Sequence, residues 1–230
     1  HIAADGVFAS TVNASGDEAA VEFQTDVANQ SAQPRKVTVH TSLFSPDDEP
    51  VAGVESSLIV TNAGLNRIRQ RITFPKPSLW NLQKPDLYRA ATSVLEDDLT
   101  VDSTTMRIGI RDARFTSEEG FVLNGKKVML KGVCLHHDGG ALGAAVPLGV
   151  WERRLMALKE LGCNAIRTSH NPVAPEFLDL CDRMGFLVMD EFFDCWTVGK
   201  NREDYHKYFD EWSLIDLRDT VRRDRNHPSV

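Results

Sequence analysis

Hydrophobic and polar residues alternate along the first part of the chain. Runs with a period of two occur at residues 21–27, 37–43, 88–94 and 105–109. Such a period is typical of β-strands that bury one face. Turn-forming residues separate the runs. The pattern predicts an antiparallel β-sandwich of about seven strands over residues 1–112.

The hydrophobic pattern changes near residue 128. The next residues, up to 135, form a nearly continuous apolar run, which is typical of a strand covered on both faces. Helices are predicted at 147–161, at 175–184 and around residues 214–221, and strands at 163–168 and 186–190, with a fourth strand beginning at residue 229. This order predicts a parallel sheet with right-handed crossovers, and three β/α units are half a barrel or half an open sheet.

A connecting segment, residues 113–127, separates the two patterns. It contains Asn124-Gly125 between apolar residues, which is a strong hairpin signal. We therefore predict two domains, covering residues 1–112 and 113–230. The chain begins at His1 without an initiator Met and ends at Val230 within an expected element, so we interpret it as an internal piece of a longer protein.

The composition is that of an ordinary globular protein. Of the 230 residues, 42% are hydrophobic and 26% are charged, which excludes a disordered chain and a coiled coil. No apolar run approaches the length that a membrane span needs. The net charge of −7 argues against nucleic acid as the main partner. The four cysteines lie in apolar stretches without paired spacing, which predicts four reduced thiols in the core.

Polar and ionisable residues follow each predicted strand of the second domain. They are His136–Asp138 after the first strand, Arg167–Asn171 after the second, and Asp190 and Glu191 after the third. The carboxyl ends of parallel strands meet at one edge, where α/β proteins carry their chemistry. The pattern therefore predicts a polar pocket. Adjacent strand residues face opposite sides, so only one of His136 and His137, and one of Asp190 and Glu191, should face it.

A metal site is an alternative interpretation of the same residues. His136, His137, His170 and Asp190 offer nitrogen and oxygen ligands. Two adjacent histidines on a strand cannot both point inward, however. We therefore expect no metal and no cofactor at this edge.

Several segments of the chain resemble glycoside hydrolase family 2. The matching motifs are Lys131–Asp138, Asn164–Pro172, Cys181–Gly185 with Val188–Glu191, and Arg223–Val230. The resemblance covers essentially the whole chain. It implies a multidomain fold in which an all-β immunoglobulin-like sandwich is followed by a partial (β/α)8 TIM barrel of about three β/α units. The segments His136–Ala145 and Asp194–Trp196 look most like bacterial β-galactosidases.

The resemblance implies a retaining, exo-acting glycosidase that cleaves terminal β-galactosides with two glutamates. Neither glutamate matches a position in this chain; both are expected beyond Val230, so the chain alone is expected to be inactive. β-Glucuronidase and β-mannosidase of the same family are the nearest alternatives. A non-catalytic module that binds carbohydrate or protein is another, with Trp80 and Tyr88 as the only candidate stacking rings.

The family pattern also implies roles for individual residues. His136, His170 and Asn171 are expected to bind the substrate. Arg167 is expected to orient the carboxylate of the nucleophile, and Asp190 to support the pocket. His137 stands where many β-galactosidases have Glu, so we give it no role. Some members bind magnesium soon after the third strand, but residues 195–197, Cys-Trp-Thr, offer no hard oxygen pair, and we predict no magnesium there.

The expected partner is a carbohydrate that contains a β-galactoside. We expect neither nucleic acid nor a membrane as a partner, and a homo-oligomer is compatible with an exposed half barrel. The compartment is not indicated by these residues; a periplasmic or secreted parent protein is suggested by the resemblance alone.

Overall fold

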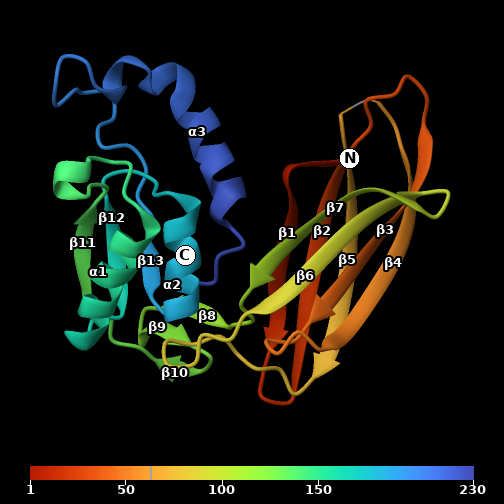
Figure 1. The fold of residues 1–230 in the computed structure, drawn as a ribbon, viewed down its shortest axis with the longest axis horizontal. Coiled ribbons are helices and arrows are strands. Elements are labelled where there is room, and N and C mark those ends of the chain that lie inside the picture. Colours follow the sequence, from red (N-terminus) through yellow and green to blue (C-terminus); the bar gives the residue numbers. More distant parts are fainter. Residues whose placement is uncertain (63) are drawn as a thin grey trace. The chain divides into compact units, whose positions relative to one another are not determined.

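The computed structural model describes residues 1–62 and 64–230 and divides the chain into two compact units, His1–Lys127 and Val128–Val230 (Figure 1). The immunoglobulin-like sandwich followed by the start of a barrel is confirmed. The boundary between residues 112 and 113 stays a prediction. None of the helices in the described residues is long and apolar enough to cross a membrane.

Two antiparallel sheets form the sandwich. One has the order β1-β2-β5, with β1 at Ile2–Ala14, β2 at Glu18–Ala28 and β5 at Leu65–Pro75. The other has the order β4-β3-β6-β7, and its strands are β4 Pro50–Val60, β3 Arg35–Phe44, β6 Tyr88–Glu96 and β7 Leu99–Ile108. The number of strands agrees with the prediction of about seven, and the four runs with a period of two overlap β2, β3, β6 and β7.

Alternate side chains of these strands fill the core between the two sheets. Phe23 and Leu43 are fully buried in one apolar cluster, and Val39 and Val94 in another. Two polar side chains in the core pair with each other: Thr41 Oγ1 donates to Gln70 Oε1 at 2.8 Å, and Gln70 Nε2 donates to the Val39 carbonyl at 2.9 Å. Such pairing avoids the cost of a buried polar group without a partner.

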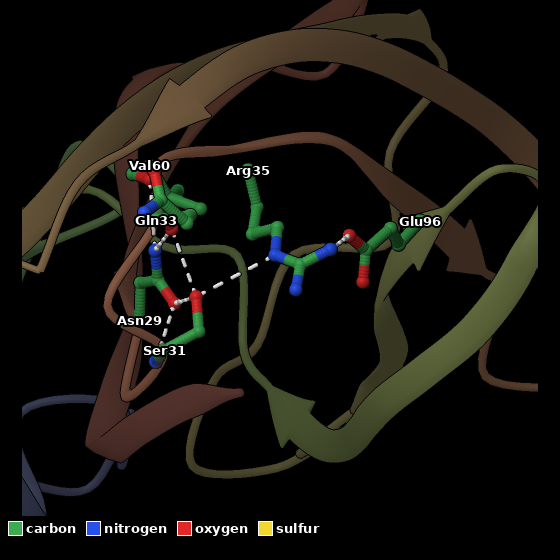
Figure 2. Close-up of polar contacts among 6 residues, drawn as sticks. All are labelled: Asn29, Ser31, Gln33, Arg35, Val60 and Glu96. Carbon is green, nitrogen blue, oxygen red and sulfur yellow. Dashed lines mark hydrogen bonds and ion pairs between the residues drawn. The ribbon is translucent and has the colours of Figure 1, made fainter.

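The loop between β2 and β3 is held by polar side chains (Figure 2). Asn29 Nδ2 donates to the carbonyls of Gln33, at 2.8 Å, and of Val60, at 3.0 Å. Arg35 forms an ion pair with Glu96 at 3.2 Å. Asn29 thus ties the loop to the end of β4, and Arg35, the first residue of β3, is tied to the end of β6.

A small antiparallel sheet, ordered β10-β9-β8, completes the first unit. Its strands are β8 Ala113–Thr116, β9 Gly120–Leu123 and β10 Lys126–Lys127. The hairpin predicted at Asn124-Gly125 is confirmed, and both residues have the positive φ that a tight two-residue turn requires, 50° and 73°. Asn124 Nδ2 also donates to the carbonyl of Trp80 at 3.0 Å.

The second unit has three parallel strands in the order β11-β12-β13: Gly132–His136, Ala165–Ser169 and Leu187–Met189. The helices are α1 Leu148–Glu160, α2 Pro175–Met184 and α3 Phe209–Asp224, with short 3₁₀ turns at Gly140–Leu142 and Tyr205–Lys207. Gly185 ends α2 with a φ of 67°, and its backbone N–H bonds to the carbonyl of Cys181.

Helices α1 and α2 cover one face of this sheet. Leu155 of α1 and Phe177 of α2 pack in one buried cluster with Ile166 of β12. The opposite face is exposed, and it carries Cys134 and Met189. The prediction that all four cysteines lie in the core is therefore wrong for Cys134, because this side of β11 is not covered in the described residues.

The start of the first predicted barrel strand and the predicted fourth strand differ from the structure. The first strand begins at Gly132 rather than residue 128, because the side chain of Asn164 bonds to the backbone there: its Oδ1 accepts from Lys131 N at 2.8 Å and its Nδ2 donates to Met129 O at 2.9 Å. Ser229 starts no strand, although its carbonyl accepts from Val188 N at 2.7 Å.

Candidate functional site

The predicted site residues come from the carboxyl ends of the three parallel strands. Parallel pairing places Cys134 opposite Arg167 and His136 opposite Ser169. Side chains of paired residues point to the same face, so Cys134 and Arg167 lie together on the exposed face of the sheet. Arg167 Nε donates to Cys134 Sγ at 3.1 Å, which raises the pKa of the guanidinium.

Glu191 connects two of the predicted site residues, Arg167 and His170. Its Oε1 lies 3.1 Å from Arg167 Nη1, and its Oε2 lies 2.8 Å from His170 Nδ1. Its backbone N–H donates to Thr168 Oγ1 at 2.8 Å, which ties the start of the loop after β13 to β12. One carboxylate therefore holds a cation and an imidazole from the end of β12.

Asp190 lies on the other side of the chain from Glu191, so the prediction that the two acids face opposite sides is confirmed. Asp190 Oδ1 accepts from Thr168 Oγ1 at 3.1 Å. Burial, together with the neighbouring carboxylate of Asp224, raises its pKa to about 6. Asp224 is itself held by Arg223, whose Nε donates to Asp224 Oδ1 at 2.7 Å.

The two adjacent histidines also separate, as predicted. His136 lies beside His170, with the rings edge to face and their centroids 5.6 Å apart. His137 instead contacts Trp151 of α1, with centroids 6.1 Å apart. Asn171 Nδ2 donates to the carbonyl of Pro172 at 2.9 Å. The structure thus brings together His136, His170 and Arg167, while Asn171 bonds to the adjacent backbone.

A cavity of about 590 Å³ opens beside His170 and Glu191. Its lining also includes the aromatic side chains of Phe193, Trp196 and Phe209. The indole of Trp196 is exposed and stacks near the ring of Phe209, with centroids 6.1 Å apart. The cavity is thus lined by both ionisable and aromatic side chains, as ligand-binding pockets commonly are.

One group of potential metal ligands lies away from this cavity. Ligand-type atoms of Asp179, Asp182 and His227 come within 4.8 Å of one another. Asp182 Oδ2 lies 2.6 Å from His227 Nδ1, and Asp182 Oδ1 accepts from Ser229 N at 3.0 Å. Both carboxylate oxygens thus have protein partners, which makes the group an ion pair that holds the segment after α3. The predicted absence of magnesium at residues 195–197 stays a prediction.

Family models match nearly the whole chain. The model described as "Glycosyl hydrolases family 2" matches residues 1–111, and that described as "Glycosyl hydrolases family 2, TIM barrel domain" matches residues 115–230. The chain belongs to glycoside hydrolase family 2. The family resemblance stated from the motifs at the strand ends is confirmed.

Individual family 2 proteins are similar over the full length of the chain. β-Galactosidase BoGH2A of Bacteroides ovatus is 44% identical over 230 residues, which are 100% of this chain and 27% of that protein. A β-glucuronidase of Bacteroides fragilis is 29% identical over 232 residues, covering 99% of this chain and 33% of that protein. The chain thus spans about a quarter to a third of these relatives.

Solved structures agree with the family 2 fold. A family 2 member from Bacteroides cellulosilyticus has a TM-score of 0.97 and 40% identity, and the match covers 100% of this chain and 30% of that one. A β-glucuronidase of Bacteroides uniformis has a TM-score of 0.84 and 28% identity, over 98% of this chain and 27% of that one. The activities named for these relatives are β-galactosidase, for the protein of Bacteroides ovatus, and β-glucuronidase, for those of Bacteroides fragilis and Bacteroides uniformis.

Sequence reasoning gave Glu191 no role in the site and placed Asp190 there as support. The period of two shows that only one of these two acids can share the face of Arg167, and the register of β12 and β13 decides which one. Arg167 and Glu191 both lie on the face of the sheet that α1 and α2 do not cover, and a charged arginine on a strand needs a carboxylate on the same face. The family 2 motif that ends in Asp190-Glu191 offers two acids, and only Glu191 lies on the same face of the sheet as Arg167 and contacts it.

Proposed function

We propose that this chain is the sandwich and the first three β/α units of a retaining, exo-acting β-galactosidase, and that it carries part of the sugar-binding site. The observation that carries the proposal is the contact of Glu191 with both Arg167 and His170 at the carboxyl ends of the barrel strands. A protein named as a β-galactosidase is 44% identical to this chain over all of its 230 residues, which supports the choice of substrate.

In this proposal, His136 and His170 bond to hydroxyl groups of the sugar. Their rings lie together at the strand ends, next to the cavity that His170 lines. Asn171 contributes to the same rim after a change of its side-chain partner, since its amide now bonds to Pro172 O. Hydrogen bonds that shorten as the sugar distorts would stabilise the transition state.

Arg167 holds the carboxylate of the nucleophile in this proposal. Its guanidinium is anchored by Glu191 at 3.1 Å, which leaves further N–H donors for a second carboxylate. Asp190 supports this arrangement indirectly, because it bonds to Thr168, and Thr168 Oγ1 accepts the N–H of Glu191.

A retaining mechanism needs two catalytic carboxyl groups about 5–5.5 Å apart, one on each side of the glycosidic bond. Glu191 is engaged with Arg167 and His170, and we give it neither catalytic part. We propose that both catalytic glutamates belong to a longer enzyme and that the 230-residue chain alone does not turn over a galactoside.

β-Glucuronidase is the second candidate function, because a β-glucuronidase of Bacteroides fragilis matches 99% of the chain. A binding module in the sandwich has less support. Trp80 and Tyr88, its candidate stacking rings, are both buried in the sandwich and offer no open ring face.

Product analysis and one variant of the complete enzyme test the proposal. We expect β-galactose as the first product from 4-nitrophenyl β-D-galactoside, because two displacements retain configuration. Arg167→Lys should lower kcat about 100-fold or more, since an ammonium cannot hold two carboxylates through a fixed fork. Arg71→Lys, at an exposed position of β5, is the matched control and should leave kcat unchanged. α-Galactose as the first product, or an active Arg167→Lys enzyme, would contradict the proposal.

A further inference from the structure

The two ring nitrogens of His170 lie in different surroundings. Nδ1 lies 2.8 Å from Glu191 Oε2, at ordinary hydrogen-bond distance. A carboxylate only accepts hydrogen bonds, so the proton of this bond belongs to Nδ1. A neutral imidazole carries one N–H, and a partner that fixes it at one nitrogen leaves a lone pair on the other.

The charge on Glu191 already has a partner. Arg167 Nη1 lies 3.1 Å from Glu191 Oε1, and an arginine is charged at all ordinary pH values. The pair Arg167–Glu191 is therefore neutral overall. The bond to His170 requires only the N–H at Nδ1, and a second proton on the ring is not needed to balance the charge.

The side chain of His170 lines the cavity, where a ligand can contact it. Across the described parts of the chain, no side chain or backbone group is hydrogen-bonded to Nε2 of His170. The side chain is 35% exposed and lines the cavity of about 590 Å³. His136 lies edge to face with the ring at 5.6 Å. A ligand in the cavity can therefore reach the ring.

We infer that Glu191 is a positioning residue that fixes His170 as the Nδ1–H tautomer and so makes Nε2 a hydrogen-bond acceptor for the ligand. The ligand group at this nitrogen must then be a hydrogen-bond donor, such as a hydroxyl. A carboxylate or another group that only accepts is excluded from this contact. That the hydroxyl belongs to a sugar rests on the proposed function.

Nuclear magnetic resonance of the 230-residue chain tests the tautomer without any substrate. The histidines are labelled with ¹⁵N, two-bond ¹H–¹⁵N correlations are recorded at pH 8.5, and His170→Gln identifies the signals of His170. We expect a protonated Nδ1 and an unprotonated Nε2. A proton on Nε2, alone or in addition to Nδ1, would overturn the inference.

Two variants separate the role of Glu191 from a general effect on folding. Glu191→Leu removes the acceptor, so the proton should shift toward Nε2 in a chain that keeps its circular dichroism spectrum. Glu160→Leu removes an exposed carboxylate at the end of α1, which packs on the other face of the sheet, and should leave the His170 signals unchanged. If Glu191→Leu keeps the Nδ1–H tautomer, Glu191 does not set it. If that variant is unfolded, the signals of the unmodified chain still decide.

The hydroxyl contact is tested in the complete enzyme with the four monodeoxy 4-nitrophenyl β-galactosides. The deoxy compound that lacks the relevant hydroxyl should lose about tenfold or more in kcat/KM with the unmodified enzyme, as for one lost hydrogen bond. In the His170→Phe enzyme, that one deoxy compound should have the same kcat/KM as the galactoside that carries all its hydroxyl groups, whereas the other three deoxy compounds should behave as in the unmodified enzyme. An equal loss in both enzymes for all four compounds would contradict the contact. An enzyme inactive on every galactoside would instead contradict the proposed function and leave the tautomer result standing.

Discussion

His227 Nδ1 lies 2.6 Å from Asp182 Oδ2, which joins the segment after α3 to the buried side of α2. The other oxygen of Asp182 accepts the backbone N–H of Ser229 at 3.0 Å. Both side chains of the ion pair are largely buried. Because a buried carboxylate without a partner is costly, this pair should stabilise the second unit.

The pair predicts one pH dependence of stability. Burial by itself lowers the pKa of His227, but the hydrogen bond and the charge of Asp182 outweigh it, and the pKa rises above its usual value. The stabilisation is therefore fully present below about pH 6.5, the usual value in an unfolded chain, and is lost as the pH rises through the folded value. Urea unfolding between pH 6 and pH 9 should show this loss.

His227→Gln provides the control for that measurement. At pH 6 it should lower the free energy of unfolding by about 3 kcal/mol, because Asp182 loses its charged partner. The variant should also lose the part of the pH dependence that lies above pH 6.5. A variant with the same pH profile as the unmodified chain would mean that His227 does not cause it.

Asp190 predicts a second pH dependence, in a lower range. Its pKa is about 6 in the folded chain against an ordinary value of 3.8, so the folded state favours the protonated form. The stabilisation that the protonated Asp190 contributes is therefore complete below about pH 4 and is lost as the pH rises to about 6. Asp190→Asn keeps a neutral side chain at all pH values, so its unfolding free energy should stay level across this range. A loss of more than about 1 kcal/mol at pH 7 in the variant would contradict the explanation.

The sandwich contains an ion pair whose removal should be costly. Arg67 Nε lies 2.7 Å from Asp26 Oδ1, and the carboxylate is fully buried. Arg67→Met should lower the free energy of unfolding by about 2 kcal/mol, because the buried carboxylate of Asp26 loses its charged partner. The arginine itself is half-exposed, so the loss of its packing should contribute little. Arg69→Met is the matched control on the same strand: the contact of Arg69 with Glu22 is 3.8 Å long and exposed, and its loss should cost less than about 0.5 kcal/mol. Chemical unfolding measures the stability of both variants. An equal loss of stability in the two would contradict the explanation that the burial of Asp26 makes its ion pair the more important one.

Packing in the half barrel can be tested on α1. Leu155 is fully buried among residues of α1, α2 and the sheet, whereas Leu161 follows the helix and is 79% exposed. Leu155→Ala should cost about 3 kcal/mol, since it leaves a cavity. Leu161→Ala should change the stability by less than about 0.5 kcal/mol. Unfolding midpoints of the two variants that do not differ would show that α1 is not packed as described.

Local periodicity predicts most of the fold. Val37, Val39 and Leu43 alternate with polar residues, and every second position faces the core of the sandwich. The turn at Asn124-Gly125 follows from the residues themselves, because both adopt positive φ. In the second unit, the glycine at position 185 ends α2 as its sequence position suggests.

The remaining features depend on contacts between distant segments. The start of β11 is set by Asn164, which binds the backbone of residues 129 and 131 and lies more than thirty positions away. Cys134 is apolar and lies in a strand, so hydrophobicity predicts burial, but its face of the sheet carries Arg167 and is not covered. Glu191, and not Asp190, meets Arg167 because its side chain lies on the same face of the sheet. Only the register between β12 and β13 decides which of the two acids lies on that face.

The central claim is that the complete enzyme is a β-galactosidase, and the most direct measurement is its kcat/KM on three nitrophenyl glycosides. The substrates are the β-D-galactoside, the β-D-glucuronide and the β-D-mannoside, compared under the same conditions. We predict that the galactoside is preferred by about 100-fold or more, because a site built for one pattern of hydroxyl groups rejects substrates that leave its buried polar groups unpaired. A higher kcat/KM on the glucuronide or the mannoside would contradict the account.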